Sequence, residues 1–167
     1  MTINKEFEQQ ILNDVRMDAF KIAIRFINYE MVPGSICEFG CYTGRSLAGL
    51  TYCYQKYFED ENKHNQKGLI SREIYGFDSF EGLTESENHP RWNKGLFKKN
   101  HSFHPTIGYG EDVTPDKVMD FFSQYKLQKP ILIKGEFEDI TLDNFKKMAL
   151  VHIDCDLYSS TIDALNK

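Results

Sequence analysis

The chain has 167 residues, which suits one domain with a single hydrophobic core. Its formal net charge is -5 and its lysines are scattered, so a nucleic-acid-binding protein with a concentrated basic face is not expected. No apolar run approaches the roughly 20 residues of a membrane-spanning helix, and the start, MTINKEFEQQ, is too polar for a signal peptide. The four cysteines form no C-x-x-C pair, which is typical of reduced thiols, and we expect a cytoplasmic protein.

Helical and extended patterns alternate along the chain. The predicted elements are, in chain order, a helix over 5–31 ended by Pro33-Gly34, a strand at 35–39, a glycine turn at 40–44, a helix over 45–58, a polar loop at 59–68, a strand at 72–77, a helix over 113–127 capped by Thr114, a strand at 130–135, a short helix over 141–148, a strand at 149–153, and a helix beginning near Ser159.

This alternation predicts an α/β fold, a three-layer, doubly wound, mostly parallel sheet. We expect residues 1–33 to form a helical segment that packs on the domain and residues 34–167 to form its core. Four strands are countable where such sheets normally have five or more, so we expect the C-terminal strands to be missing from this chain. Residues 84–112 have no clear period, and their aromatic residues favour an ordered lid over a disordered insert.

The stretch ICEFGCYTGRS sets Glu38, Gly40 and Gly44 at the carboxyl end of the first predicted strand, where open parallel sheets bind ligands. The glycine spacing differs from the dinucleotide-binding motif, and Glu38 would repel a pyrophosphate. An acid there suits a ligand with an ammonium or sulfonium group, such as S-adenosylmethionine. A plain tight turn with an exposed glutamate is the alternative.

Two further strand ends carry polar residues. Asp78, in YGFDSFEGL, can accept hydrogen bonds from both hydroxyls of a ribose, although a loop-capping aspartate fits as well. In IKGEFEDITL, Gly135, Glu136 and Phe137 follow the third strand, where an aromatic ring can stack on a purine. The acids of that stretch equally suit the approach to a helix.

A fourth stretch, VHIDCDLYSSTIDAL, follows these three. With the four stretches in this order, the chain resembles the macrocin O-methyltransferase family of S-adenosylmethionine-dependent enzymes from about Gly34 onward. The resemblance implies a Rossmann-like class I methyltransferase that methylates a hydroxyl of a sugar or related small molecule with the help of a divalent metal, usually Mg²⁺. It implies cofactor contacts at Glu38, Phe39, Gly40, Thr43, Gly44, Ser46, Asp78, Ser79, Gly135, Glu136 and Phe137.

The same resemblance implies that Asp154 is a metal ligand. Because side chains alternate along an extended segment, Asp156 leans the same way, and we expect it to support the metal site or to cap the next helix. The family completes this site with paired aspartates on a further strand, and this chain ends before that strand. The family's general base is a histidine after the second strand; His101 and His104 are the candidates, and each also suits a solvated loop.

Three functions stay open at this point. The first is an S-adenosylmethionine-dependent O-methyltransferase with a small hydroxylated acceptor, alone or as a homo-oligomer. The second is a metal-dependent nucleotide-sugar glycosyltransferase, since D-x-D with a metal can hold a diphosphate; Glu38 argues against it. The third is a non-catalytic module that binds S-adenosylmethionine or a partner.

Overall fold

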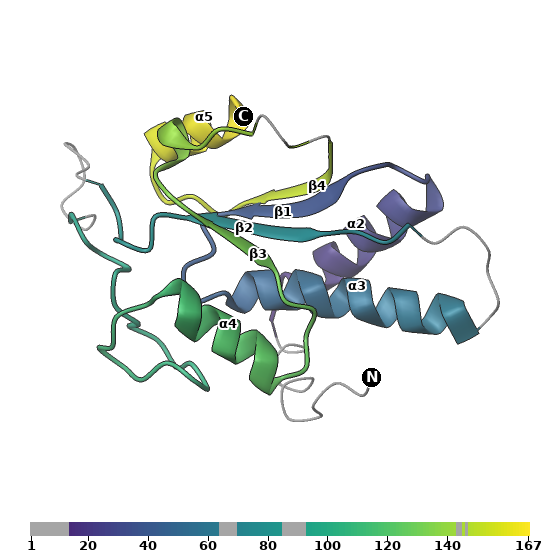
Figure 1. Cartoon of the computed structure of the whole chain (residues 1–167), viewed down its shortest axis with the longest axis horizontal. Helices are drawn as coiled ribbons and strands as arrows, with labels where there is room; N and C mark the ends of the chain where they lie inside the picture. Colours follow the sequence, from purple (N-terminus) through teal and green to yellow (C-terminus); the bar gives the residue numbers. More distant parts are fainter. Residues whose placement is uncertain (1–13, 64–69, 85–92, 143–144, 146) are drawn as a thin grey trace.

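The protein is described here by a computed structural model, which places residues 14–63, 70–84, 93–142, 145 and 147–167. Figure 1 shows a parallel sheet between two layers of helices. One face carries α2 (Met17–Tyr29), α3 (Arg45–Lys63) and α4 (Pro115–Gln124), and the other carries α5 (Tyr158–Leu165). The predicted three-layer α/β architecture is confirmed. Within the described residues, no helix has both the length and the apolar character needed to cross a membrane.

Four strands form the sheet, in the order β3-β2-β1-β4. They are β1 (Ser35–Phe39), β2 (Ile74–Asp78), β3 (Ile131–Lys134) and β4 (Met148–Ile153), and every neighbouring pair is parallel. Phe39 lies opposite both Phe77 and Ile153, so β1, β2 and β4 end at the same level. The residues that follow these strands therefore share one edge of the sheet, the edge where parallel α/β folds bind ligands.

Alternating side chains of the strands feed two hydrophobic clusters. Ile36 and Ile74 point toward α2 and α3, where they pack with Ile24, Leu47 and Leu50. On the other face, a second cluster is formed by Cys37, Phe39, Phe77, Ile140 and Ala164. The central strand is thus buried on both sides, which explains why its sequence reads as an unbroken apolar run apart from Glu38.

Arg72 fastens α2 to the sheet. Its side chain is buried, and the guanidinium donates to the backbone oxygens of Ile27 (3.1 Å) and Gly34 (2.7 Å) and to Oδ1 of Asn28 (3.3 Å). These acceptors lie at the carboxyl end of α2 and at the turn into β1. A cation at a helix carboxyl terminus also interacts favourably with the helix dipole.

Several predicted boundaries differ from the structure. α3 runs to Lys63, beyond the predicted end at 58, because the polar residues that follow are compatible with a helix. The helix predicted over 141–148 is wrong where it can be judged: 141, 142, 145 and 147 are not helical, and Met148 begins β4 by pairing with β1. The first thirteen residues of the chain, which hold the start of the helix predicted over 5–31, lie outside the described residues. The short 3₁₀ helix η1 (Phe137–Asp139) was not predicted.

The segment expected to form a lid is described from residue 93 onward, and we call residues 93–112 the lid loop. Its centre is the fully buried Asn100, whose side-chain nitrogen donates to the backbone oxygen of Ile107 at 2.6 Å. Lys99 and Asp112 form an isolated antiparallel bridge, and Ile107 is buried in the main core. Trp92 lies outside the described residues. The lid loop is therefore an ordered structure attached to the domain.

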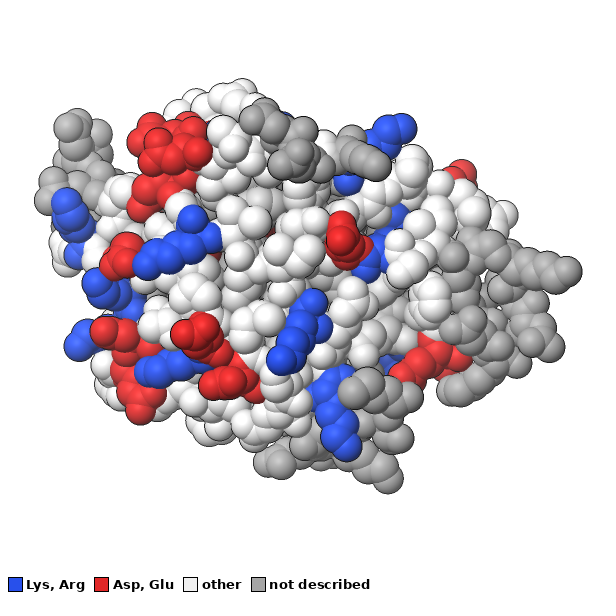
Figure 2. All heavy atoms as spheres, in the orientation of Figure 1, with Lys and Arg blue, Asp and Glu red and all other residues white. Residues whose placement is uncertain are grey.

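Charged side chains are mixed over the face seen in Figure 2. Lys and Arg side chains alternate with Asp and Glu rather than gathering in one basic patch.

Candidate functional site

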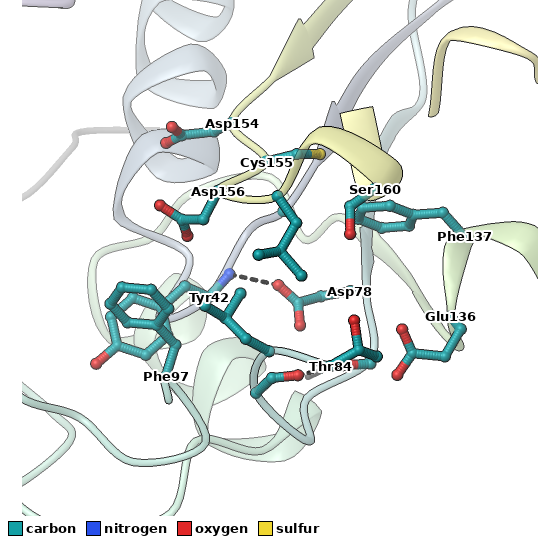
Figure 3. Close-up of a pocket in the computed structure, with 15 residues that line it drawn as sticks. Tyr42, Asp78, Thr84, Phe97, Glu136, Phe137, Asp154, Cys155, Asp156 and Ser160 are labelled. Carbon is teal, nitrogen blue, oxygen red and sulfur yellow. Dashed lines mark hydrogen bonds between the residues drawn. The ribbon is translucent and has the colours of Figure 1, made fainter. Parts of the chain in front are cut away.

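A pocket opens at the carboxyl edge of the sheet, between the glycine turn, the strand ends, the lid loop and the start of α5 (Figure 3). It brings together residues that are far apart in the sequence. Its lining consists of Gly40, Tyr42, Asp78, Ser79, Gly82, Leu83, Thr84, Phe97, Glu136, Phe137, Asp154, Cys155, Asp156, Leu157 and Ser160.

The charge of this pocket is one-sided. Four carboxylates line it, and none of the described lining residues is Lys, Arg or His; the acids are Asp78, Glu136, Asp154 and Asp156. Desolvation raises the pKa of Asp78 and of Asp156, and the neighbouring charges of Asp154 and Asp78 raise the pKa of Asp156 further. The pKa of Glu136 is raised by desolvation and then by Asp78. Carboxylates that disfavour one another's charge are stabilised by a cationic guest.

Asp78 is held in place by the backbone. Its Oδ2 accepts from the backbone nitrogen of Tyr42 and its Oδ1 from that of Phe80, each at 2.8 Å. Each carboxylate oxygen has a further lone pair, so the side chain can cap the loop and still accept hydroxyls of a ligand. The two interpretations of Asp78 are therefore compatible.

The end of β3 supplies the opposite wall. The backbone nitrogen of Gly135 donates to the backbone oxygen of Asp78 at 3.1 Å, which sets β3 beside β2 at this edge. Glu136 and Phe137 follow and both line the pocket, with the Phe137 ring edge-on to Phe39 at 5.5 Å between centroids. This places an aromatic ring and a carboxylate on one wall, and their contact with a purine stays a prediction.

The glycine turn needs positive φ angles at Gly40 and Gly44, which residues with a Cβ rarely adopt. Gly40 has φ +84°, and a Cβ there would collide with the backbone oxygen of Asp154. Gly44 has φ +80° and packs against Val118 of α4. Of the other predicted contacts in this stretch, Phe39 is buried in the core, and Thr43 and Ser46 are buried beside the turn, outside the pocket lining.

Glu38 is a buried residue of strand β1, and it is not exposed at the glycine turn. Its side chain is fully buried on the α2 side of the sheet, with Oε1 2.7 Å from Nδ1 of His152, and it does not line the pocket. Burial raises the pKa of Glu38, and the glutamate in turn raises the pKa of His152. Oε2 has no hydrogen-bond partner among the described residues. The alternative of an exposed glutamate is wrong, and contact with a ligand stays a prediction.

Asp154 already has a cationic neighbour. Arg16, directly before α2, places Nη1 3.0 Å from Oδ2 of Asp154 and pairs with Asp14 through Nη2 at 2.8 Å. Glu38, His152 and Asp154 offer possible metal-ligand atoms that all lie within 4.8 Å of one another. Sequence analysis missed Arg16, because nothing local links it to a residue 138 positions away.

A magnesium ion fits some of these donors better than others. Mg²⁺ prefers oxygen ligands and keeps several waters, so the carboxylates of Asp154 and Asp156 on the pocket wall suit it. An imidazole such as that of His152 is more typical of transition metals. The pocket carboxylates are therefore the better part of the donor set for magnesium.

The two lid histidines do not line the pocket. His104 is buried against Phe121, with ring centroids 4.5 Å apart, and its Nδ1 faces the backbone nitrogens of Thr106 and Ile107. Burial lowers the pKa of His104 to about 4, so the ring is neutral and orders the loop. His101 is exposed at the loop surface. The assignment of a general base stays a prediction; of the two histidines, His101 is the one that solvent can reach.

Comparisons with known proteins identify the family and the fold of the chain. The family model described as Macrocin-O-methyltransferase (TylF) matches residues 6–167. Among solved structures, the O-methyltransferase NovP matches with a TM-score of 0.61 and 19% identity, over 90% of this chain and 57% of that one. CalS11, a calicheamicin methyltransferase, matches with a TM-score of 0.47 and 20% identity, over 98% of this chain and 60% of that one.

The likeness to NovP shows the fold. The chain spans 57% to 60% of the length of these solved structures. No curated protein matches it.

Proposed function

Since the chain belongs to the macrocin O-methyltransferase family, we propose that it transfers a methyl group from S-adenosylmethionine to a hydroxyl of a sugar or related small molecule. The observation that carries this proposal is the pocket with four carboxylates and no basic residue among its described lining residues. S-adenosylmethionine carries a sulfonium and an ammonium group and no phosphate, so its charge complements this pocket. The diphosphate of a nucleotide sugar would meet repulsion there.

The donor has a natural orientation in the pocket. Asp78 would accept the ribose hydroxyls, as a bidentate carboxylate at a strand end can. Phe137 would contact the purine face, with Glu136 near its exocyclic amine. The sulfonium would then lie toward Asp154 and Asp156, on the side of the pocket formed by β4 and α5.

Asp154 and Asp156 would hold the magnesium ion, which would orient an acceptor hydroxyl and lower its pKa. The protein's main contribution is alignment, because a displacement at the methyl carbon needs the attacking oxygen in line with the leaving sulfur. Tyr42, Phe97 and Leu157 form pocket walls that can exclude water from this region. His101 is proposed as the proton acceptor, carried by a loop next to the pocket.

The setting of the protein is also part of the proposal. The four cysteines, Cys37, Cys41, Cys53 and Cys155, are all free, which is typical of a reducing compartment. We therefore propose a cytoplasmic location, with a small-molecule acceptor as the principal partner.

Transfer of a labelled methyl group tests the proposed function. The protein is incubated with S-adenosylmethionine labelled in the methyl group, Mg²⁺ and a panel of hydroxylated sugars, glycosides and nucleotide sugars. We expect label in one acceptor class and its loss in the variant D78N. Binding of S-adenosylhomocysteine without transfer to any acceptor would favour the non-catalytic module, and binding of UDP-glucose that needs Mn²⁺ would favour the glycosyltransferase.

A further inference from the structure

Tyr42, in the middle of the glycine turn, has a backbone conformation that tyrosine rarely adopts. Its φ is +44°, in the left-handed region that favours glycine or asparagine. A strained residue persists when its surroundings determine its conformation, and such residues often mark functional sites. The contacts of Tyr42 show what determines it here.

Three parts of Tyr42 reach three parts of the site. Its backbone nitrogen donates to Oδ2 of Asp78 at 2.8 Å. Its hydroxyl donates to the backbone oxygen of Lys99 at 2.8 Å and accepts from the backbone nitrogen of His101 at 2.9 Å. Its ring meets Phe97 edge-on, with centroids 5.3 Å apart. Figure 3 shows Tyr42 and Phe97 together on one side of the pocket, with the hydrogen bond from Tyr42 to Asp78.

The lid loop has other attachments near the pocket, among them two backbone hydrogen bonds with Leu83: the nitrogen of Leu83 donates to the oxygen of Leu96 at 2.7 Å, and the nitrogen of Gly95 donates to the oxygen of Leu83 at 2.8 Å. Lys98 pairs with Glu81 at 2.7 Å and Arg45 donates to the backbone oxygen of Phe103 at 3.3 Å, and both contacts are at exposed positions. Exposed ion pairs contribute little to order because water competes for both partners. The phenol of Tyr42, whose two hydrogen bonds are also at exposed positions, uses both its donor and its acceptor function on the loop backbone and so joins residues 99 and 101 to the glycine turn.

We propose that Tyr42 is a positioning residue that fixes the lid loop over the donor pocket and thereby slows the release of the donor. This inference rests on the proposed function, because it assigns a role at the same site. One residue links Asp78 and Phe97, which line the pocket, to residues 99 and 101 of the lid loop. The strained turn conformation is what aims the phenol at the loop.

The variant Y42F tests the inference, because it keeps the ring and removes both hydroxyl hydrogen bonds. We expect the His101 amide to exchange its hydrogen about ten-fold faster or more in the unliganded protein, in line with the loss of two hydrogen bonds. We also expect S-adenosylhomocysteine to dissociate about ten-fold faster in stopped-flow measurements, with its association rate within about two-fold and the melting temperature nearly unchanged. Y29F is the matched control, since Tyr29 is 82% exposed.

Two results would overturn the inference. One is unchanged His101 exchange together with unchanged release of S-adenosylhomocysteine in Y42F. The other is a slower association rate or a large fall in melting temperature, which would indicate a general structural role. If the parent protein binds no S-adenosylhomocysteine, the proposed function fails, and exchange at His101 in Y42F still decides whether the phenol holds the loop.

Discussion

At the scale of single residues, the site is a set of carboxylates in different surroundings. Asp78 is fixed by two backbone nitrogens, whereas Asp154 is half-exposed and paired with Arg16. Glu38, the acid nearest the glycines in sequence, is buried against His152 instead of facing the pocket. We therefore expect substitutions of these acids to have different effects on donor binding and on metal binding.

Replacing Asp78 by asparagine should weaken donor binding strongly. The substitution conserves shape but removes the charge and one acceptor, and a lost charge-assisted hydrogen bond costs about 1.5–3 kcal/mol, or roughly 10- to 100-fold in affinity. Isothermal titration with S-adenosylhomocysteine measures the effect. D120N, at an exposed position of α4, is the control and should leave the affinity unchanged. Equal affinity in D78N and the parent protein would remove Asp78 from the donor site.

Removing the charge of Arg16 should strengthen the binding of a divalent metal at Asp154. The guanidinium is 3.0 Å from that carboxylate, and an exposed pair of this kind contributes up to about 1 kcal/mol, so R16Q should bind Mn²⁺ about three- to five-fold more tightly. Electron paramagnetic resonance of the free ion measures binding without any turnover. R25Q, on the exposed face of α2, is the control. Tighter binding in R16Q that persists in the double variant with D154N would contradict this assignment.

At the scale of elements, the residues at the edge of the sheet are predictable from sequence, whereas the contacts of the lid loop that covers this edge are not. The acids at the ends of β2, β3 and β4 could be placed together from sequence, because parallel strands end at one edge. Glu38 lies two residues after Ile36 and therefore on the same face of β1, a strand that is covered on both faces. The burial of Glu38 could thus have been predicted from the strand pattern. The contact of Tyr42 with the lid loop depends on a left-handed turn and on residues 57 positions away, which no local pattern encodes.

The attachment of α2 depends on Arg72. R72M should lower the free energy of unfolding by about 2–4 kcal/mol, because two buried acceptors, on Ile27 and Asn28, and the partly buried oxygen of Gly34 lose a charged donor. Urea denaturation followed by circular dichroism measures the change. R25M is the matched control at an exposed position of α2, and it should change the stability by less than about 0.5 kcal/mol. A loss below about 1 kcal/mol in R72M would show that water replaces the guanidinium.

At the scale of the whole molecule, the buried titratable groups predict how stability depends on pH. The pKa values of Glu38, Asp78 and Glu136 are raised in the folded chain, and so is that of His152. The folded state therefore binds these protons more tightly than the unfolded state, and stability falls as pH rises through the raised values. Below the ordinary carboxyl range of about pH 4, acids whose pKa is lowered by a cation, such as Asp14, lose their contribution.

His104 works in the opposite sense: its pKa is lowered to about 4 by burial, so stability rises with pH up to the ordinary histidine value of 6.5. We therefore expect the unligated protein to be most stable near pH 6.5 and to lose stability as the pH rises above this value through the raised pKa of His152. Thermal unfolding across this range measures the curve. H152Q should flatten it, because the glutamine keeps a donor for Glu38 but does not titrate. A stability that rises steadily to pH 8 in both proteins would contradict the pairing.

The central claim concerns the charge of the pocket, and isothermal titration with competing donors tests it most directly. The protein is titrated with S-adenosylmethionine, with NADH, and with UDP-glucose in the presence of Mn²⁺. The account predicts that S-adenosylmethionine saturates a single site and that neither diphosphate compound competes with it. Saturable binding of UDP-glucose or NADH, with no heat from S-adenosylmethionine, would contradict it.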